Sequence, residues 1–357
     1  MAIKLPVIAT LGGHSALEIF AGAKKYGFRT LVLTVKGRDK TYLNYFKNLV
    51  DDYLILDSFT DLSNQEIVTK LNQLNCIFIP HRYCQVYCDL LKLEKDFNIP
   101  IFGNKYLLKY EEREGIFNQY QLLYNSQVDY PKQFKDPKKI DRLCIIKVKE
   151  SDRGYERAFF FAKNYSQYLA KSQKLLHENR INNQSLKDAV IEEYLVGVQV
   201  NFNFYYSPLK NRLELLSTDM RRQTNIDGLI RLPSDIQQEL KNDLIPSYIE
   251  TGHVAVTVKE SLLERAYILA QRILDGTKLT VPGGIIGPFA LQTAIVAGPP
   301  KEKIVIYDLS LRIPGSPGTA FTPYSGYLFG ENMTFGDRIA LEIKEAVENR
   351  LLSKIIT

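Results

Sequence analysis

The residues whose types and spacing best suit chemistry lie between Lys303 and Gly315, in the run KIVIYDLSLRIPG. An apolar stretch reaches Asp308, and Ser310 and Arg312 follow at alternate positions. Because alternate side chains of a strand share a face, we expect these three groups to project together. A carboxylate can bind a hard cation, a hydroxyl can add an oxygen ligand, and a guanidinium can grip phosphate. The pattern suits a magnesium–phosphate site, although an edge strand with one solvated face is the simpler interpretation of this stretch alone.

The composition is that of an ordinary soluble globular protein, with 45% hydrophobic and 24% charged residues among 357. This length predicts two or three domains. No apolar run approaches the ~18 residues of a membrane span, and the chain begins without a signal-peptide pattern, so we expect a cytoplasmic protein with no membrane partner. Four cysteines predict no disulfide framework, and buried thiols are favoured over a metal pair at Cys84 and Cys88. The net charge of +6 is dispersed, which suits small anionic substrates and indicates no nucleic-acid partner.

Residues 1–103 alternate β-rich runs with helical patterns, which predicts a parallel doubly wound sheet. Ligands of such sheets bind at the carboxyl ends of the strands. Two loops qualify, Gly12–Ser15 and Pro80–Tyr83, because each places a histidine and helix-start amides where an anion could bind. An ordinary tight turn explains the glycine pair equally well. The sequence has neither a GxGxxG fingerprint nor a Walker loop, which argues against an obvious dinucleotide domain or P-loop enzyme.

Beyond residue 102 the sequence predicts a hairpin with a charged tip. Leu143–Val148 reads as a buried strand that carries Lys147, Glu150–Arg157 as a polar turn, and Ala158–Ala162 as the returning strand. A lysine inside an apolar strand is costly unless it meets an anion, so Lys147 indicates an anion site. A lysine that snorkels at the strand edge explains the same pattern.

Polar groups recur along the strands that follow. Val190–Gly197 is a predicted strand that ends in acids and a glycine. Val198–Tyr206 alternates, so that Gln199 and Asn201 or Asn203 can face one side.

Two further stretches could contribute to a site. Asp219–Gly228 is predicted as a loop with adjacent arginines and Asn225, which suits an anionic sugar phosphate, although a solvated basic loop is an equal alternative. Phe289–Val296, with Gln292 inside it, and Ile304–Leu309 are predicted to be antiparallel neighbours across a tight connection.

Together these features resemble the ATP-grasp superfamily, which has a Rossmann-like front domain, a lid hairpin with a lysine, an acidic hinge strand and a strand pair bearing metal ligands. DLSLRI at 308–313 is similar in spacing to the superfamily's metal strand, typically EINPRP. Within it, the likeness is to the PurP type, the formate-dependent formaminoimidazolecarboxamide ribonucleotide (FAICAR) synthetases of archaeal purine synthesis. It covers nearly the whole chain, in the segments IATLGGHSALEI, FGN, EEYLVGVQVNFNFYYSPLKNRLELL, RRQTNIDGLIRLP and IIGPFALQTAIV.

The resemblance implies an α/β protein in which a Rossmann-like N-terminal domain with a parallel sheet precedes an ATP-grasp α+β fold. It divides the chain into a Rossmann-like pre-ATP-grasp domain at residues 1–103, an ATP-grasp lid subdomain at 104–189, and a C-terminal metal and substrate domain at 190–357. It also implies a homo-oligomer.

The implied activity is that of an ATP-dependent carbon–nitrogen ligase of IMP biosynthesis. Formate would attack the γ-phosphate of ATP to give formyl phosphate. The amine of aminoimidazolecarboxamide ribonucleotide (AICAR) would then take the formyl group, which leaves ADP, phosphate and FAICAR. ATP and Mg²⁺, or Mn²⁺ in its place, are the implied cofactors. Such chemistry depends on positioning and charge neutralisation more than on a protein nucleophile.

The resemblance also assigns roles to individual residues. The implied catalytic residues are Asp308 and Arg312. The implied metal ligands are Gln292, Asp308 and Ser310. The implied ATP contacts, in part through the hinge backbone, are Lys147, Arg153, Glu192, Glu193, Leu195 and Gln199. The implied substrate contacts are His14, Ser15, His81, Arg221, Arg222 and Asn225.

Two segments depart from the family pattern. The lid turn, a GGKGYF-like run in the family, reads ESDRGYER here, with Gly154 alone and Arg153 and Arg157 as replacement cations. The substrate loop, PHGSF-like in the family, carries the bulky Arg82 and Tyr83. Two alternatives therefore stay open, a divergent ligase with another amine or acid and a non-catalytic nucleotide-binding paralogue.

Overall fold

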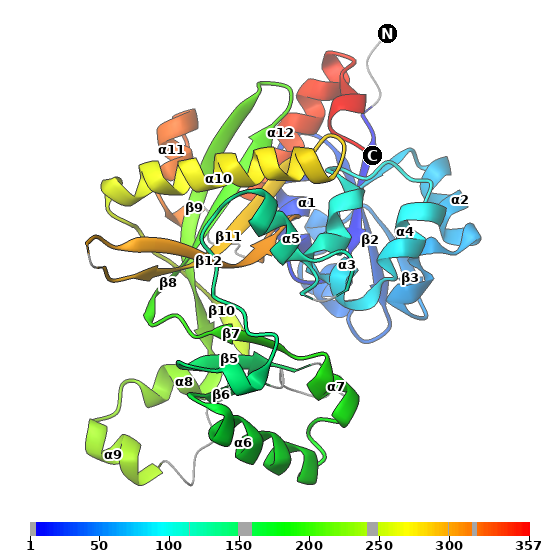
Figure 1. The fold of residues 1–357 in the computed structure, drawn as a ribbon. Coiled ribbons are helices and arrows are strands. Elements are labelled where there is room, and N and C mark those ends of the chain that lie inside the picture. Colours follow the sequence, from blue (N-terminus) through cyan, green and yellow to red (C-terminus); the bar gives the residue numbers. More distant parts are fainter. Residues whose placement is uncertain (1–4, 114, 149–158, 241–248, 299, 316–319) are drawn as a thin grey trace.

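The computed structural model describes residues 5–113, 115–148, 159–240, 249–298, 300–315 and 320–357. These residues form a four-stranded parallel sheet, a five-stranded antiparallel sheet, and a three-stranded antiparallel sheet that lies apart from the other two (Figure 1). The arrangement confirms the expected Rossmann-like parallel sheet followed by an α+β fold. No described helix is long and apolar enough to cross a bilayer.

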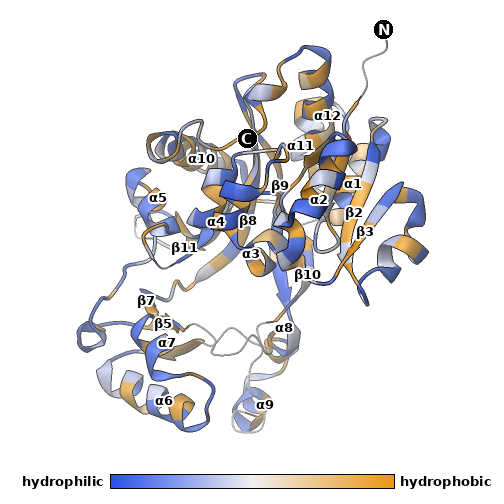
Figure 2. Ribbon diagram, turned by 90° about the vertical axis from the view of Figure 1, so that its right-hand side faces the viewer, coloured by the Kyte–Doolittle hydropathy of each residue, from blue (hydrophilic) through white to orange (hydrophobic). Residues whose placement is uncertain are grey.

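The parallel sheet has the strand order β3-β2-β1-β4. Its strands are apolar, and β2 is largely hydrophobic in Figure 2. The loops after β1 and β4 meet at one edge because these two strands are parallel neighbours. The elements of this unit are β1 (Val7–Leu11), α1 (Ala16–Lys25), β2 (Arg29–Val35), β3 (Asp52–Leu56), α2 (Gln65–Gln73), β4 (Cys76–Phe78), α3 (Arg82–Tyr87) and α4 (Leu90–Asp96).

The end of the chain packs against this parallel sheet. Helix α12 (Phe335–Glu348) crosses α1 so closely that neither Gly22 nor Gly336 has room for a Cβ atom. The last residue, Thr357, exchanges two backbone hydrogen bonds with Ile101, of 2.9 and 3.0 Å. One hydrophobic core includes residues of α1, the parallel sheet and α12, so the front sheet and the C-terminal helix are held together.

The three-stranded sheet has the order β6-β5-β7 and carries α6 and α7 (Figure 1). We call it the lid sheet. Strands β5 and β6 pair as an antiparallel hairpin, as predicted. The predicted turn between them, Glu150–Arg157, lies outside the described residues. The elements are β5 (Cys144–Lys147), β6 (Phe159–Ala162), α6 (Tyr165–His177), α7 (Asn183–Lys187) and β7 (Val190–Glu193).

The five-stranded sheet has the order β10-β9-β8-β11-β12, and every neighbouring pair is antiparallel. The predicted pairing of β11 with β12 is confirmed. The elements are α5 (Gln119–Asn125), β8 (Gly197–Ser207), β9 (Arg212–Gln223), α8 (Thr224–Leu229), α9 (Ser234–Glu239), β10 (Glu250–Ala255), α10 (Glu260–Thr280), β11 (Gly287–Val296), β12 (Lys303–Ser310) and α11 (Tyr324–Phe329).

The prediction of a loop over Asp219–Gly228 is wrong. Strand β9 continues to Gln223, and α8 follows directly. The strand extends this far because β10, which the sequence did not reveal, pairs with it and places His253 opposite Arg221. Arg221 and Arg222 are neighbours on a strand and therefore point to opposite faces of the sheet.

A fully buried ion-pair network joins α12 to the five-stranded sheet. Arg338 donates from Nε to Glu214 Oε2 and from Nη1 to Glu342 Oε2, each at 2.7 Å. Its guanidinium also lies 4.3 Å from the centroid of the Tyr205 ring. All three of these side chains are shielded from water, and Glu214 has a second cation in Arg212, whose Nη2 lies 2.7 Å from Glu214 Oε1.

Replacing Arg338 with alanine should lower the free energy of unfolding by about 3–5 kcal/mol, because the buried Glu342 loses its ion pair and Glu214 is left with Arg212 alone. The matched control is Lys210→Ala, which removes a partly exposed ion pair of 2.9 Å to Glu345 on the same helix. That control should cost at most about 1 kcal/mol. Urea unfolding followed by circular dichroism measures both, and equal losses would contradict the role of Arg338.

Candidate functional site

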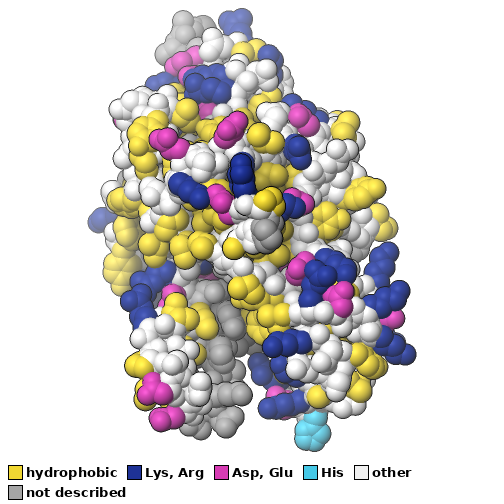
Figure 3. Space-filling view, turned by 60° about the vertical axis from the view of Figure 1, so that its left-hand side comes forward, with side chains coloured by type: hydrophobic (Ala, Val, Ile, Leu, Met, Phe, Trp, Pro, Cys, Tyr) yellow, Lys and Arg dark blue, Asp and Glu magenta, His cyan; other side chains and the backbone are white. Residues whose placement is uncertain are grey.

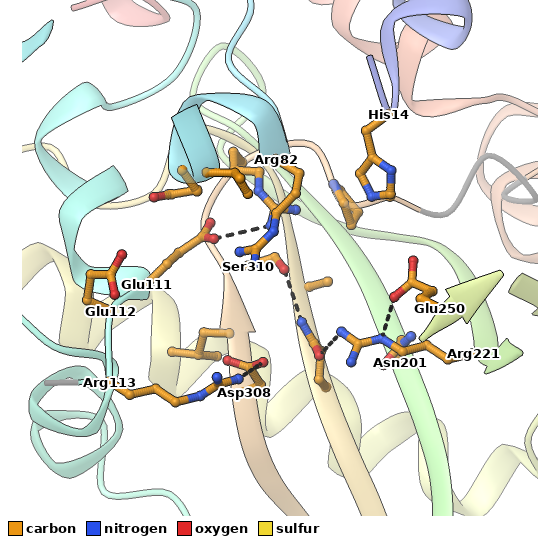
Figure 4. A pocket seen from close by; sticks show the side chains of 18 of the residues that line it. His14, Arg82, Glu111, Glu112, Arg113, Asn201, Arg221, Glu250, Asp308 and Ser310 are labelled. Atoms are coloured by element: carbon orange, nitrogen blue, oxygen red, sulfur yellow. Dashed lines mark hydrogen bonds and ion pairs between the residues drawn. The ribbon is translucent and has the colours of Figure 1, made fainter. Parts of the chain in front are cut away.

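A cavity of about 590 Å³ opens among the five-stranded sheet, the carboxyl-edge loops of the parallel sheet and the lid sheet (Figure 4). This volume is typical of small-molecule sites. The surface is hollowed between two lobes at one end of the molecule, and basic side chains there are interspersed with acidic and apolar ones (Figure 3). The charged or titratable side chains that line the cavity are His14, Arg82, Glu111, Glu112, Arg113, Lys147, Arg221, Glu250, His253, Asp308 and Arg312.

A row of polar side chains crosses four neighbouring strands beneath this cavity. Asp219 of β9 lies opposite Asn201 of β8, which in turn lies opposite Gln292 of β11. Gln292 lies opposite Asp308 of β12. Directly opposed residues of antiparallel strands share a face, so the four side chains point the same way. Three of them line the cavity, and Asp219 is buried beside it.

Cations gather around Asp308. Arg113 Nη2 lies 2.6 Å from Asp308 Oδ2, and this carboxylate raises the pKa of Arg113. Lys147 on the lid strand β5 forms an ion pair with the buried Glu192 of β7. Burial lowers the pKa of Lys147, and Glu192 acts in the opposite direction. Lys147 also interacts electrostatically with Arg113 and Asp308, so these three groups form one side of the cavity.

Side chains from the chain around α5 close the free edge of β12. The Leu311 amide donates to Glu111 Oε1 at 2.6 Å, and the Leu309 amide donates to Gln119 Oε1 at 2.9 Å. The same Glu111 carboxylate pairs with Arg312 Nη2 at 3.2 Å. Burial raises the pKa of Glu111, against the influence of Arg312. Occupied edge amides fix the end of β12, and with it the direction of Arg312.

Of the two residues predicted to bind substrate in the first loop, His14 lines the cavity and Ser15 does not. His14 lines the cavity, and its ring packs so tightly on Gly315 that a Cβ atom would not fit there. Burial and the Arg312 charge lower the pKa of His14 to about 4, so the ring is neutral at pH 7. Ser15 is buried and donates its hydroxyl to the Pro314 carbonyl at 3.2 Å. A substrate in this cavity can contact His14 but not the Ser15 side chain as placed.

The second loop presents Arg82 instead of the predicted His81. The His81 ring is fully buried, donates from Nε2 to the Leu11 carbonyl at 2.8 Å and accepts at Nδ1 from the Tyr83 amide. Burial lowers its pKa to about 3. His81 is therefore the buried N-cap residue of α3, whereas Arg82 lines the cavity. The Tyr83 ring packs directly on Gly13 and covers the first loop.

Of the residues assigned to ATP, only Lys147 lines the cavity among those that the structure describes. Lys147 lines the cavity, and Glu192 is buried next to it, where it accepts the Tyr120 hydroxyl at 2.7 Å. Arg153 lies outside the described residues. The remaining assigned side chains follow on the hinge without lining the cavity: Glu193, Leu195 and Gln199.

The residues of the predicted basic loop also separate. Arg221 lines the cavity and donates from Nη2 to Gln292 Oε1. Arg222 points to the other face, is half exposed and lies 4.0 Å from Asp227. Asn225 lies on α8, outside the cavity lining. Of the three, only Arg221 is placed to meet a ligand there.

A hydrogen-bonded group that the sequence did not reveal lies beside Arg221. His253 contacts Asp219 through Nδ1 and Glu250 Oε1 through Nε2, the latter at 2.8 Å. Burial opposes a charge on this ring, but the two carboxylates raise the pKa of His253 to about 9. Burial also opposes ionisation of Glu250, but His253 and Arg221 lower its pKa to about 2. The group is therefore an imidazolium between two carboxylates at neutral pH.

Simple alternation could not have found this group. Glu250 and His253 are three residues apart, which places them on opposite faces of a regular strand. A register shift between Glu250 and Gly252 brings both side chains to the cavity. Other cavity residues that were missed, Glu111 and Arg113, come from a segment that showed only a charged helical pattern.

The oxygen donors near Asp308 fit Mg²⁺. Asp308 and Gln292 face each other across β11 and β12, and Ser310 accepts from Gln292 Nε2 at 3.2 Å. Among the described residues there is no cluster of three or more His, Cys, Asp or Glu side chains that could hold a metal ion. Mg²⁺ typically binds through one or two carboxylates plus substrate phosphates, which this donor set allows.

The Rossmann-like domain, the lid sheet and the antiparallel sheet together have the fold of the ATP-grasp class. A solved structure of similar fold is the N5-carboxyaminoimidazole synthetase of Staphylococcus aureus complexed with ADP, with a TM-score of 0.59 at 14% identity, covering 89% of this chain and 74% of that one. Two family models match, a protein of unknown function (DUF1246) over residues 8–134 and a domain of unknown function (DUF1297) over residues 167–357.

Two further relatives are much more similar. The 5-formaminoimidazole-4-carboxamide-1-(beta)-D-ribofuranosyl 5'-monophosphate synthetase of Methanocaldococcus jannaschii is 36% identical over 98% of this chain and 94% of its own length. The crystal structure of an IMP biosynthesis protein PurP from Thermococcus kodakaraensis has a TM-score of 0.73 at 25% identity, covering 98% of this chain and all of that one. The chain belongs to this PurP family of FAICAR synthetases.

The protonation of His253 predicts how stability depends on pH. Its pKa of about 9 lies above the ordinary value of 6.5, so its stabilising contribution is fully present below pH 6.5 and is lost as pH rises through about 9. The difference in unfolding free energy between the wild type and His253→Asn should therefore shrink across that window. Urea titrations at several pH values measure it, with the exposed His177→Asn as control. A pH-independent difference would contradict a charged His253.

Proposed function

We propose that this protein is an ATP-dependent ligase that formylates AICAR with formate to give FAICAR, ADP and phosphate in IMP biosynthesis. The observation that carries the proposal is the facing pair Gln292 and Asp308, with Arg113, Lys147 and Arg312 around it in one cavity. This group combines oxygen ligands for a metal with three cations for phosphate. The names of its relatives in the family support the choice of substrates.

The triphosphate of ATP fits the side of the cavity formed by Lys147, Arg113 and Asp308. Lys147 comes from the lid sheet and Arg113 from the segment before α5, so the two cations approach from different elements. The Nε atom of Arg113 is buried and has no hydrogen-bond partner within the described residues. Charge-assisted contacts of this kind stabilise the charge that builds up during phosphoryl transfer.

Mg²⁺, held by Asp308 and by the amide and hydroxyl oxygens of Gln292 and Ser310, would neutralise phosphate charge when bound. The same ligands would accept Mn²⁺ in place of Mg²⁺. The role of the protein is to hold Asp308 with Arg113 at 2.6 Å and to keep Gln292 opposite it by strand register.

The reaction balances without a protein nucleophile. A formate oxygen attacks the γ-phosphorus of ATP, the bond to the ADP oxygen breaks, and formyl phosphate forms. The AICAR amine then attacks the formyl carbon, the bond from that carbon to the phosphate oxygen breaks, and the nitrogen loses a proton. Arg312, fixed by Glu111 at 3.2 Å, lies where it can stabilise the phosphoryl group in both steps.

The ribonucleotide fits the opposite side, where His14, Arg221 and Glu250 line the cavity (Figure 4). Neutral His14 can donate a hydrogen bond, Arg221 supplies a positive charge, and Glu250 supplies an acceptor for hydroxyl or amine protons. The two reactants would therefore meet above the row formed by Asn201, Gln292 and Asp308.

A ligase with another amine or acid is a second candidate, and one observation favours it. Arg82 projects into the cavity, and Tyr83 covers the glycine turn of the first loop. Both side chains take space where a ribonucleotide phosphate could otherwise meet helix-start amides. ATP consumption with other amines but not with AICAR would support this candidate, and nucleotide binding without turnover on any amine would support a non-catalytic paralogue.

The proposal extends to features beyond the cavity. We place domain limits near residues 103 and 189, just after the parallel bridge of Ile101 to Phe78 and just before the hinge strand β7. We further propose a cytoplasmic homo-oligomer, the state that the resemblance to the PurP family implies. Light scattering of the purified protein tests self-association directly.

Turnover is the first test of the proposal. Purified protein with Mg²⁺, ATP, formate and AICAR should release ADP and phosphate and form FAICAR in equal amounts, as measured by liquid chromatography. Omission of either formate or AICAR should prevent FAICAR formation. The proposed function would be excluded if AICAR were recovered unchanged while ATP binding persisted.

Asp308→Asn should lower kcat by about 100-fold or more, because the amide removes the only carboxylate in the facing pair and leaves Arg113 unpaired. Coupled measurement of ADP release detects the change. The exposed Asp57→Asn is a matched control for the same chemical substitution away from the cavity. Wild-type ATP cleavage by the Asp308 variant would remove this residue from the mechanism.

A further inference from the structure

A continuous chain of polar contacts runs from the buried floor of the sheet to the end of β12. It begins at Asp219, which receives hydrogen bonds from Asn201 Nδ2 at 3.0 Å and Asn203 Nδ2 at 2.6 Å. Asp219 and Glu250 hold the two nitrogens of His253. With both nitrogens directed at carboxylates, the ring is kept from rotating.

The two oxygens of the Glu250 carboxylate contact different residues, His253 and Arg221. Oε1 meets His253 at 2.8 Å, and Oε2 lies 3.2 Å from Arg221 Nε. Arg221 in turn donates to Gln292 Oε1, and Gln292 donates to Ser310 Oγ at 3.2 Å. Figure 4 shows this last part of the chain along one wall of the cavity. The direction of Arg221 therefore depends on where His253 holds Glu250.

We propose that His253 is a positioning residue that holds Arg221, through Glu250, in the direction needed to bind the ribonucleotide. This inference rests on the proposed function and deepens it, because it assigns the side of the cavity opposite Lys147 to the phosphorylated amine substrate. Both ring nitrogens of His253 are already engaged by Asp219 and Glu250, so it acts through its neighbours and not by contact with the reacting atoms.

The charge balance explains why a histidine suits this position. Asp219 and Glu250 are two acids close to one Arg221, which leaves one negative charge without compensation unless the ring is protonated. The groups that act on His253 from the neighbouring elements are Asp219 and Arg221 of β9, Glu250 of β10 and His14 of the first loop. The imidazolium supplies the missing charge, so Arg221 stays available for an anionic ligand.

An asparagine at this position has a side-chain amide that can bond one carboxylate but cannot carry the charge. In His253→Asn, Glu250 is then free to pair more fully with Arg221 and to draw it away from its contact with Gln292. Misplacement of a binding group by about 1 Å can cost about 100-fold in rate. The substitution should weaken the binding of AICAR and leave the binding of MgADP, on the Lys147 side of the cavity, unchanged.

Titration calorimetry with AICAR and with MgADP tests the proposal on the wild type, His253→Asn and the control His177→Asn. We expect at least about 10-fold weaker AICAR binding by His253→Asn, with MgADP affinity within about twofold of the wild type. His177→Asn, which changes an exposed residue of α6, should match the wild type for both. Equal AICAR affinity of the His253 variant and the wild type would overturn the proposal.

Two measurements on the wild type keep the proposal testable if the variant fails to fold. AICAR affinity should fall as pH rises through about 9, the pKa of His253, while MgADP affinity should change less. Nitrogen-15 NMR of the four histidines should show both ring nitrogens of His253 protonated at pH 7. A His253 ring that carries only one proton at pH 7 would overturn the proposal by itself.

The outcome also separates this inference from the proposed function. If the wild type binds no AICAR, the proposed substrate is wrong. The NMR result then still decides whether the protonated ring exists, and a singly protonated ring would refute the positioning role without bearing on the substrate. If AICAR binds and turns over but the His253 variant is unaffected, the function stands and the positioning role fails.

Discussion

Strand register in the five-stranded sheet fixes the site, because it sets which side chains face the cavity. Asp308, Gln292 and Asn201 share a face only while β12, β11 and β8 keep their present alignment. A slip of one residue would turn each of them into the core. The opposite face prevents such a slip, since alternate residues such as Phe202 and Leu291 are fully buried in the core that α10 covers. Packing on one side of the sheet thus determines the chemistry on the other.

Paired charges surround the cavity, and each pair comes from separate elements. Asp308 with Arg113 and Glu111 with Arg312 tie the end of β12 to the segment before α5. Lys147 with Glu192 ties the two lid strands β5 and β7 together. Buried charges without partners are costly, so these pairs hold cations near the cavity in the protein without ligand. An anionic substrate can then compete for a cation that is already oriented, which lowers the cost of binding.

The sequence predicts the parallel front sheet, the lid hairpin and the strand pair that carries Asp308, but it does not predict β10. Alternation predicted β11 and β12 as antiparallel neighbours, and it placed Asp308, Ser310 and Arg312 together, all of which line the cavity. Local pattern failed where tertiary contacts decide the outcome. Arg221 was assigned to a loop because its strand partner β10 was not visible in the sequence.

Histidines illustrate the same limit. The loop position of His81 predicts a substrate contact, but both ring nitrogens form hydrogen bonds to the backbone of β1 and α3. His253 has no motif. Pairing of β10 with β9 places it beside Asp219, and a register shift in β10 brings Glu250 to the same side. Periodicity describes which face a residue occupies, but it cannot report a bulge or a partner from a distant segment.

Isotope transfer from formate is the most direct test of the central claim, that Asp308 and its surrounding cations bring formate and ATP together for phosphoryl transfer. With doubly oxygen-18-labelled formate, ATP and AICAR, phosphate released by the wild type should contain one oxygen-18 atom per molecule, as read by mass spectrometry. That oxygen would come from formate, because it bonds to phosphorus in the first step and leaves with it in the second. Unlabelled phosphate formed together with FAICAR would contradict this account of the site.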